Sequence, residues 1–231
     1  MGTRQSIYFS KKRGRDLLRK QFPDVDILGV DYSSNMIEQA RADYKDDSHM
    51  LFEVADASKD LETMKHRFDL VFSNACIQWV PNHDKLINDI INAVKSGGYL
   101  AIQQPYNYDE PIYLLIRETI ASSRWKSRIN DSRTFYHLRA NDYYDLLATR
   151  CEDINVWMTT YKHTMPSHEA ILDWYRGTGL RPYIQALGDD KESIQEFEKD
   201  ILDRIVTAYP KQKDGNIIFD FPRLFFTAKV K

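Results

Sequence analysis

The sequence is poor in several residue types that define common kinds of site. It has only two cysteines, Cys76 and Cys151, in 231 residues, which is too few for a disulfide framework or a cysteine-rich zinc site. It has no run of about 18 apolar residues that would span a membrane, and no signal-peptide core at its start. Its formal charge is only −2, so nucleic acid and anionic membranes are not favoured partners. These absences predict a cytoplasmic protein, and we expect a monomer.

Strand-like and helix-like segments alternate through the first half of the chain. The short β-rich runs are "DVDILGVD", "MLFEVAD", "RFDLVFSNA" and "GYLAIQQP", and "SSNMIEQARADYK" and "KLINDIINAVK" have helical periodicity. In the first helix Met36, Ile37 and Ala40 would share one face, and Gly97 would end the second helix as a left-handed cap. Such alternation predicts an α/β fold, with a parallel sheet covered by helices on both sides.

The second half of the chain has a different pattern. Residues 108–150 and 167–209 have helical character, and each of these two ranges is followed by a long strand-like run. The strand-like runs are "DINVWMTTYKHTM" and "NIIFDFPRLFFTAKVK". We expect a single domain over residues 1–231, in which the last strand is antiparallel and the two helical ranges form a lid.

Polar residues follow three of the predicted strands, namely Asp31, Asp56 and Asn74. In an open parallel sheet, ligands gather outside the carboxyl ends of the strands. The two oxygens of Asp31 could accept both hydroxyls of an adenosine ribose, and Asp56 could accept the adenine amino group. The thioether of Met36 could lie against the adenine ring. The alternative is that the two acids cap turns in solvent and that Met36 belongs to the core.

Taken together, these segments resemble a known family. In order and spacing, "LGVDYSSNMIEQA", "FEVADA", "FDLVFSNACIQWV" and "VKSGGYLAIQ" are similar to class I S-adenosylmethionine-dependent methyltransferases. The segments "SNACIQWVPNH", "TTYKHTMPSHEAILDWYRGTGLRPY" and "GNIIFDFPRLFFTAKV" resemble the narrower trans-aconitate 2-methyltransferase family. The resemblance implies a Rossmann-like sheet with a helical lid, S-adenosylmethionine as cofactor, and methyl transfer to a carboxylate of trans-aconitate.

The resemblance also implies a role for particular residues. The implied cofactor contacts are Asp31 on the ribose, Met36 and Ala57 on the two sides of the adenine, Asp56 on its amino group, and Asn74 near the methionine moiety. Gln78 and Trp79 would line the acceptor side. The acceptor carboxylate is already ionised at neutral pH, so no general base is needed, and catalysis would come from positioning and desolvation.

A polycarboxylate acceptor calls for cationic side chains, because the planar guanidinium of arginine matches a carboxylate. Arg181 in "GLRPY" and Arg223 in "FPRLF" lie in the family-like segments, and Tyr161 and His163 lie on the strand-like run before the second helical range. Taken singly, each arginine could equally form a surface ion pair. A related dicarboxylate or an alkylsuccinate would use the same cations, so the acceptor stays open between these small carboxylates.

The chain departs from the family where glycine is expected. Class I methyltransferases have a central first strand followed by a Gly-x-Gly-x-Gly turn, whereas this chain has "SIYFSKKRGRD". Residues 7–9 could form the strand and Gly14 could relax one turn, with Lys11, Lys12 and Arg13 in the loop. Side chains there would restrict close approach of the backbone to the cofactor. Either the natural N-terminus is truncated or read in another frame, or the basic loop is a genuine variant that meets the methionine carboxylate.

Two further hypotheses belong to other classes of protein. A non-catalytic remnant could keep the fold and bind a partner or a carboxylate ligand. A nicotinamide-dependent oxidoreductase would also explain Asp31, but it would not explain Asp56 or the "SNACIQW" segment. Cys76 is expected to be a small buried hydrophobe, and His163 and His168 have no carboxylate pattern around them, so we predict no metal site.

Overall fold

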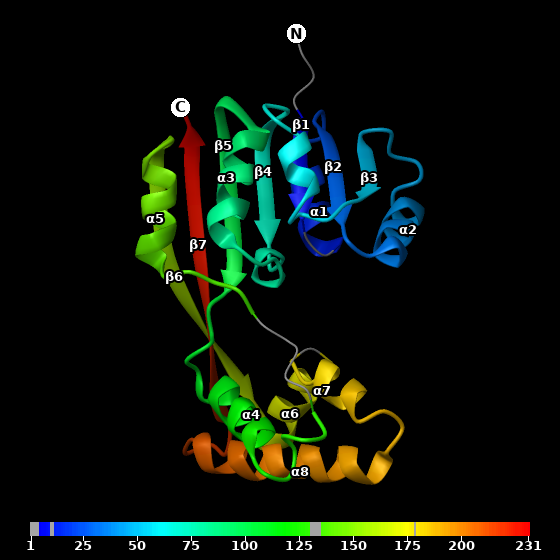
Figure 1. Ribbon diagram of the computed structural model, residues 1–231, viewed down its shortest axis with the longest axis vertical. Helices are drawn as coiled ribbons and strands as arrows, with labels where there is room; N and C mark the ends of the chain where they lie inside the picture. Colours follow the sequence, from blue (N-terminus) through cyan, green and yellow to red (C-terminus); the bar gives the residue numbers. More distant parts are fainter. Residues whose placement is uncertain (1–4, 10–11, 130–134, 178) are drawn as a thin grey trace. The chain divides into compact units, whose positions relative to one another are not determined.

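The computed structural model describes residues 5–9, 12–129, 135–177 and 179–231. Its strands form one seven-stranded sheet in the order β3-β2-β1-β4-β5-β7-β6 (Figure 1). The strands are β1 (Gln5–Phe9), β2 (Asp26–Asp31), β3 (Met50–Val54), β4 (Phe68–Asn74), β5 (Val94–Pro105), β6 (Cys151–Met165) and β7 (Ile217–Val230). The four pairs formed by β1 to β5 are parallel, whereas the arrow of β7 points opposite to those of β4 and β5. The sheet is therefore mixed, and the predicted α/β class is confirmed.

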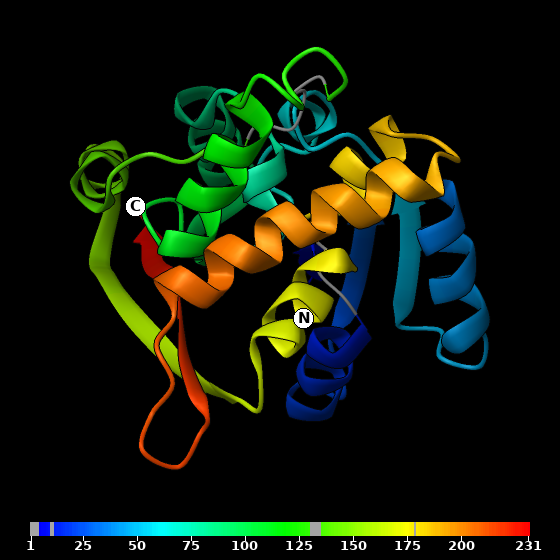
Figure 2. The same cartoon turned by 90° about the horizontal axis from the view of Figure 1, so that it is seen from below.

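Helices fill the connections between the strands. They are α1 (Lys12–Gln21), α2 (Ser34–Asp43), α3 (His83–Ala93), α4 (Pro111–Ala121), α5 (Ala140–Ala148), α6 (His168–Arg176), α7 (Arg181–Ala186) and α8 (Lys191–Ala208), with 3-10 turns η1 (Asp60–Thr63) and η2 (Ile77–Trp79). Helix α2 packs on β2 and β3, and α3 packs on β4 and β5. Figure 2 shows α1 and α3 on opposite faces of these strands.

Strand β2 shows why this part of the sheet forms. Its residues Ile27, Leu28 and Val30 are all buried, as expected for a strand covered on both faces. A Cβ added to Gly29 would lie 2.6 Å from Cδ1 of Phe52, so glycine lets the Phe52 ring pack directly on the β2 backbone. Asp31, a predicted cofactor contact, is the last residue of this apolar strand.

The central strand β1 comes from the segment that lacks the glycine-rich turn. Its residue Ile7 pairs with Leu28 of β2 and with Val71 of β4, so the predicted substitute strand lies at the middle of the sheet. Helix α1 already begins at Lys12 and includes Gly14. The expectation that Lys12 and Arg13 belong to a loop was therefore wrong, and Gly14 lies in the helix rather than at a turn, since a helix tolerates one glycine at a cost of roughly 1 kcal/mol. Lys11 lies outside the described residues, and both hypotheses about the N-terminus stay predictions.

The end of α3 also differs from the expectation. The helix ends at Ala93, and the amide of Val94 caps it by donating to the carbonyl oxygens of Ile90 and Ile91. Val94 already pairs with Phe68 of β4, so the chain enters the sheet at once. Gly97 does have a positive φ of 78°, but it lies inside β5 rather than at a helix cap. Pairing with β4 overrides the local glycine signal.

The chain divides into two compact units. Unit 1 comprises residues 1–105, 135–159 and 224–231, and unit 2 comprises residues 106–134 and 160–223. Helix α5 of the first predicted lid range belongs to unit 1, whereas α4 and α6 to α8 belong to unit 2. The single-domain and lid assignments stay predictions.

Each unit has its own apolar cluster. In unit 1, α2 with β2 and β3 encloses Ile27, Ile37, Ala40, Met50 and Phe52. In unit 2, a cluster forms where α8 runs beside α4 and α6 (Figures 1 and 2). Among the described residues, no helix combines the length and the apolar character needed to cross a membrane.

Candidate functional site

A pocket of about 590 Å³ opens in unit 1 where β2, β3 and β4 end. These strands are parallel, so the residues after them meet at one edge of the sheet. The lining residues are Val30, Asp31, Tyr32, Met36, Ala55, Asp56, Ala57, Ser58, Asn74, Ala75, Cys76, Trp79, Val80 and Pro81. The structure thus brings together all five residues predicted to hold the cofactor, together with Trp79.

Asp31 is fixed by the turn that joins β2 to α2. Its Oδ1 accepts a hydrogen bond of 2.9 Å from the amide of Ser33. Ser33 is in turn the N-cap of α2, and its side chain accepts from the amide of Met36 at 3.4 Å, as helix caps do. The Oδ2 of Asp31 accepts no hydrogen bond from the residues that the structure describes. It can therefore accept one from a ligand.

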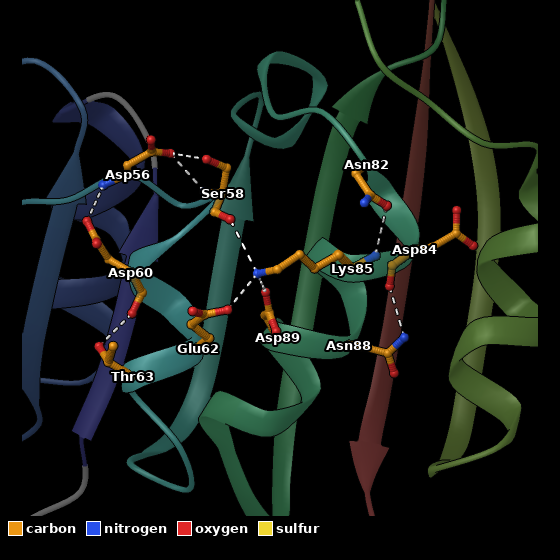
Figure 3. A network of polar contacts seen from close by, with 10 residues as sticks. All are labelled: Asp56, Ser58, Asp60, Glu62, Thr63, Asn82, Asp84, Lys85, Asn88 and Asp89. Atoms are coloured by element: carbon orange, nitrogen blue, oxygen red, sulfur yellow. Dashed lines mark hydrogen bonds and ion pairs between the residues drawn. The ribbon is translucent and has the colours of Figure 1, made fainter.

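Asp56 lies in a network of hydrogen bonds (Figure 3). Its Oδ1 accepts from the Ser58 hydroxyl at 2.6 Å and from the Ser58 amide at 2.9 Å. Its own amide donates to Oδ2 of Asp60 at 2.7 Å. The Ser58 hydrogen bonds hold the pKa of Asp56 below its usual value, because they favour the charged form. The carboxylate is thus ionised at neutral pH, and its Oδ2 lies 3.4 Å from Nζ of Lys59.

Met36 does not share the buried face of α2 that was predicted for it. Ile37 and Ala40 are buried as expected, but Met36 is 44% exposed and lines the pocket. It stands in the first turn of the helix, directly after the segment that Asp31 and Ser33 hold. Its polarizable thioether can therefore contact an aromatic ring of a ligand, with Ala57 also in the pocket wall.

The turn after β4 holds its backbone in an unusual conformation. Ala75 has φ of 54°, in the left-handed region. Its amide donates to the carbonyl of Gln103 at 2.9 Å, and its carbonyl accepts from Nε2 of Gln78 at 3.0 Å. The turn presents Asn74 and Cys76 to the pocket. Burial, and to a smaller degree the Asp31 carboxylate, raises the pKa of the Cys76 thiol to about 12, so this thiol is a poor nucleophile at neutral pH.

Gln78 and Trp79 are neighbours in η2 but have different surroundings. Trp79 lines the pocket, and its ring centroid lies 4.5 Å from that of Phe135. Gln78 does not line the pocket, because its side chain is buried and holds the Ala75 turn. Its Oε1 is buried without a hydrogen-bond partner among the described residues. Gln78 and Trp79 were both predicted to line the acceptor side, but only Trp79 lines this pocket.

The remaining predicted residues belong to unit 2. The guanidinium of Arg223 lies 4.9 Å from the ring centroid of Phe221 and 6.0 Å from that of Tyr161. The ring centroid of His163 lies 6.2 Å from that of Phe221 and 6.5 Å from that of Tyr161. Burial lowers the pKa of Arg223, but a guanidinium remains charged at neutral pH. Arg181 begins α7 and is exposed, and no contact within the described residues joins it to this group.

Sequence reasoning missed several pocket residues. Ser58 could have been found, because a serine two residues after an aspartate commonly donates to its carboxylate in a turn. Tyr32, Val80 and Pro81 adjoin predicted residues but carry no distinctive signal. Phe135 is remote from Trp79 in the sequence, so only the folded chain brings the two rings together.

The sheet order and the acids at its carboxyl edge define a class of protein. This is a Rossmann-like α/β protein whose pocket has the volume of a small-molecule site, since ligand pockets occupy roughly 300–1,000 Å³. Solved structures agree on the fold. The YcgJ protein from Bacillus subtilis has a TM-score of 0.60 at 13% identity, covering 99% of this chain and 92% of that one. Phosphoethanolamine N-methyltransferase 2 from Haemonchus contortus, in complex with S-adenosyl-L-methionine, has a TM-score of 0.57 at 20% identity, covering 100% and 50%.

The family follows from sequence comparison. The chain belongs to the methyltransferase domain family, whose model matches residues 14–179. It is 38% identical over 213 residues to a trans-aconitate 2-methyltransferase of Enterobacter sp. (strain 638), covering 92% of this chain and 80% of the relative. It is 39% identical over 217 residues to the trans-aconitate 2-methyltransferase of Azoarcus sp. (strain BH72), covering 92% and 81%. The predicted recognition and the S-adenosylmethionine cofactor are thereby confirmed.

The pocket residues fit this cofactor. The Oδ2 of Asp31, which accepts no hydrogen bond from the described residues, suits a donor such as a ribose hydroxyl, and the exposed Met36 offers a soft apolar wall to a purine. The fit concerns the adenosine end, since residues 10–11 between β1 and α1 lie outside the described chain. Within the described parts of the chain, no group of three or more His, Cys, Asp or Glu side chains could hold a metal ion.

Proposed function

We propose that this chain transfers the methyl group of S-adenosylmethionine to a carboxylate oxygen of trans-aconitate, or of a closely similar small polycarboxylate, and so forms a monomethyl ester. The observation that carries the acceptor is the 38–39% identity to trans-aconitate 2-methyltransferases over 92% of the chain. The proposal includes a cytoplasmic monomer, in which the helices of residues 108–150 and 167–209 act as a lid and β7 is the antiparallel last strand.

At the cofactor, each pocket residue has a defined task. Asp31 accepts from the ribose hydroxyls, Asp56 accepts from the adenine amino group, and Met36 and Ala57 flank the ring. Asn74 lies toward the methionine moiety, and Trp79 contributes to the acceptor side. The support is that these six side chains line one pocket and that Asp56 is held ionised by Ser58.

When bound, the cofactor supplies an electrophilic methyl group on a positively charged sulfur. The acceptor oxygen forms its bond to carbon as the carbon–sulfur bond breaks, and S-adenosylhomocysteine leaves with the electron pair. No proton is transferred, so the chain needs no general base, and the protonated Cys76 in the pocket agrees with this. The contribution of the protein is alignment and exclusion of water.

Recognition of the acceptor is assigned to cationic and aromatic residues of unit 2, and the buried Gln78 is left with its structural role in the Ala75 turn. Arg223 is the main candidate, because its guanidinium is half-buried and stacked on an aromatic ring. Tyr161 and His163 lie in the same group, and Arg181 is a further cation on α7. Arginine is well suited to hold the carboxylates that are not methylated.

The test is a methyl-transfer assay with labelled S-adenosylmethionine, using trans-aconitate and, separately, an alkylsuccinate. We expect a monomethyl ester of trans-aconitate, identified by mass spectrometry. Faster esterification of the alkylsuccinate would reassign the acceptor. Calorimetric titration with S-adenosylhomocysteine runs in parallel, and an absence of binding there would overturn the enzyme assignment itself.

A further inference from the structure

Lys85 joins three separate segments of unit 1 without lining the pocket. It lies on α3, where its amide donates to the side chain of the N-cap Asn82. Its Nζ donates to Oδ2 of Asp89 at 2.7 Å, to Oε2 of Glu62 at 2.9 Å and to the carbonyl of Ser58 at 3.4 Å (Figure 3). The first acceptor is on α3 itself, the second is on η1, and the third is in the turn after β3.

The contact with Ser58 leads directly to the pocket. The hydroxyl and amide of Ser58 donate to Oδ1 of Asp56, so a single residue separates the Lys85 ammonium from that carboxylate. Glu62 provides a second hold on the same segment, because η1 begins at Asp60, which accepts from the Asp56 amide. Lys85 therefore holds the segment that follows Asp56 at two points, the Ser58 carbonyl and the Glu62 carboxylate.

The electrostatics favour a persistent link. Hydrogen bonds to Asp89 and then Glu62 raise the pKa of Lys85, and the bond from Lys85 lowers the pKa of Glu62. The Asp89 side chain is only 11% exposed, so it anchors the ammonium on the rigid helix. Exposed ion pairs add little to stability, so the effect of this cation should appear in the local geometry of the turn rather than in the stability of the fold.

The chain contains a matched pair that lacks this connection. Lys199 and Asp203 on α8 have the same i,i+4 spacing and the same 2.7 Å distance, and the pKa of Lys199 is raised by Asp203. This pair lies in unit 2, on the exposed surface of α8. Its loss should therefore remove only a surface ion pair and leave cofactor affinity unchanged.

We propose that Lys85 is a positioning residue for cofactor binding: it holds the turn of Ser58 so that the Asp56 carboxylate is aligned for the adenine amino group. The inference rests on the proposed assignment of Asp56 to the adenine. Lys85 acts through the turn and touches neither cofactor nor acceptor.

The experiment compares Lys85→Met, Lys85→Arg and Lys199→Met in the full chain. For Lys85→Met we expect S-adenosylhomocysteine binding about three- to tenfold weaker by calorimetry, in the range of one or two lost hydrogen bonds. The KM for S-adenosylmethionine should rise by a similar factor, while kcat at saturation stays within about twofold. Lys85→Arg should restore most of the affinity, and Lys199→Met should leave it unchanged. Unaltered cofactor affinity in Lys85→Met would overturn the proposal.

A double-mutant cycle with Asp56→Asn separates this inference from the proposed function. If Lys85 acts through Asp56, adding Lys85→Met to Asp56→Asn should not weaken binding further, because coupled residues are not additive. Full additivity would reject the positioning role. If Asp56→Asn alone leaves the affinity unchanged, the adenine assignment fails; if Asp56→Asn weakens binding and Lys85→Met does not, only the positioning role fails.

Discussion

The two units present their candidate residues in different ways. In unit 1 the candidates follow successive parallel strands, so Asp31, Asp56 and Asn74 meet at one edge of the sheet whatever the details of packing. In unit 2 three of the four candidates come from the long strands β6 and β7, where Arg223 and His163 lie near the rings of Phe221 and Tyr161, and Arg181 begins α7. Backbone topology therefore places the first set, whereas side-chain packing places the second.

Both units also bury apolar side chains away from these candidate residues. In unit 1 the cluster around α2 contains Phe52, and Phe68 and Phe226 are fully buried elsewhere in the unit. The unit 2 cluster includes Trp125, Phe197 and Phe219 among its fully buried side chains. Core substitutions in unit 2 should thus mainly change stability, and substitutions at the strand ends of unit 1 should mainly change cofactor affinity.

The largest expected effect is that of Phe197→Ala in unit 2. Phe197 is fully buried, and its ring meets that of Trp125 edge to face at 5.2 Å. Removing it should lower the free energy of unfolding by about 3–5 kcal/mol, as for other buried Phe to Ala changes. Urea titration followed by tryptophan fluorescence measures this. Lys199→Met on the same helix is the control and should cost less than about 1 kcal/mol; equal losses would show that Phe197 is no core residue.

Asp31→Ala should have the next largest effect, and it concerns binding. Loss of hydrogen bonds to a charged carboxylate should weaken S-adenosylhomocysteine binding roughly tenfold to hundredfold, as measured by calorimetry. The control is Asp26→Ala at the other end of β2, whose carboxylate contacts Nδ1 of His49 at 2.6 Å. That variant should keep its cofactor affinity. If both variants bind equally well, the strand-end assignment is incorrect.

Arg223→Met tests the acceptor side of the comparison. Loss of one guanidinium–carboxylate contact should raise the KM for trans-aconitate about tenfold and leave S-adenosylhomocysteine affinity unchanged. Steady-state kinetics at saturating cofactor measure the change. Arg204→Met is the matched control, because Arg204 pairs with Glu118 on the surface of the same unit. An unchanged KM in Arg223→Met would remove Arg223 from the acceptor site.

Much of unit 1 could be predicted from the sequence, because its signals are local. Apolar runs that end in polar residues predicted β2 and the strand-end cluster, and the structure places Asp31, Asp56 and Asn74 in one pocket. The end of α3 could not be predicted, since the pairing of Val94 with Phe68 depends on a distant strand. A local pattern reports what a segment prefers, and tertiary pairing decides between comparable preferences.

The site was less predictable than the fold for the same reason. The positions of Asp31 and Asp56 after predicted strands placed the two acids together, whereas the family resemblance paired Gln78 with Trp79 on the acceptor side. In the structure Gln78 is buried under the Ala75 turn, a role that requires the positive φ of Ala75 to be known. Likewise, the contact between Trp79 and Phe135 comes from a segment whose position no local pattern specifies.

The smallest expected effect is that of Ala75→Gly, in the turn after β4 that Gln78 holds. An alanine in the left-handed region costs about 1 kcal/mol or more relative to glycine, while the greater freedom of glycine in the unfolded chain offsets part of this gain. We expect the free energy of unfolding to rise by about 0.5 kcal/mol, with cofactor affinity unchanged because Gln78 still holds the turn. Ala57→Gly is the control: Ala57 lines the same pocket, but it is not among the described residues with positive φ, so glycine should destabilise the chain there. Equal destabilisation by both variants in urea titrations would show that the backbone at Ala75 is unstrained. The hydrogen bond from Gln78 would then not be needed to hold the turn in a strained conformation.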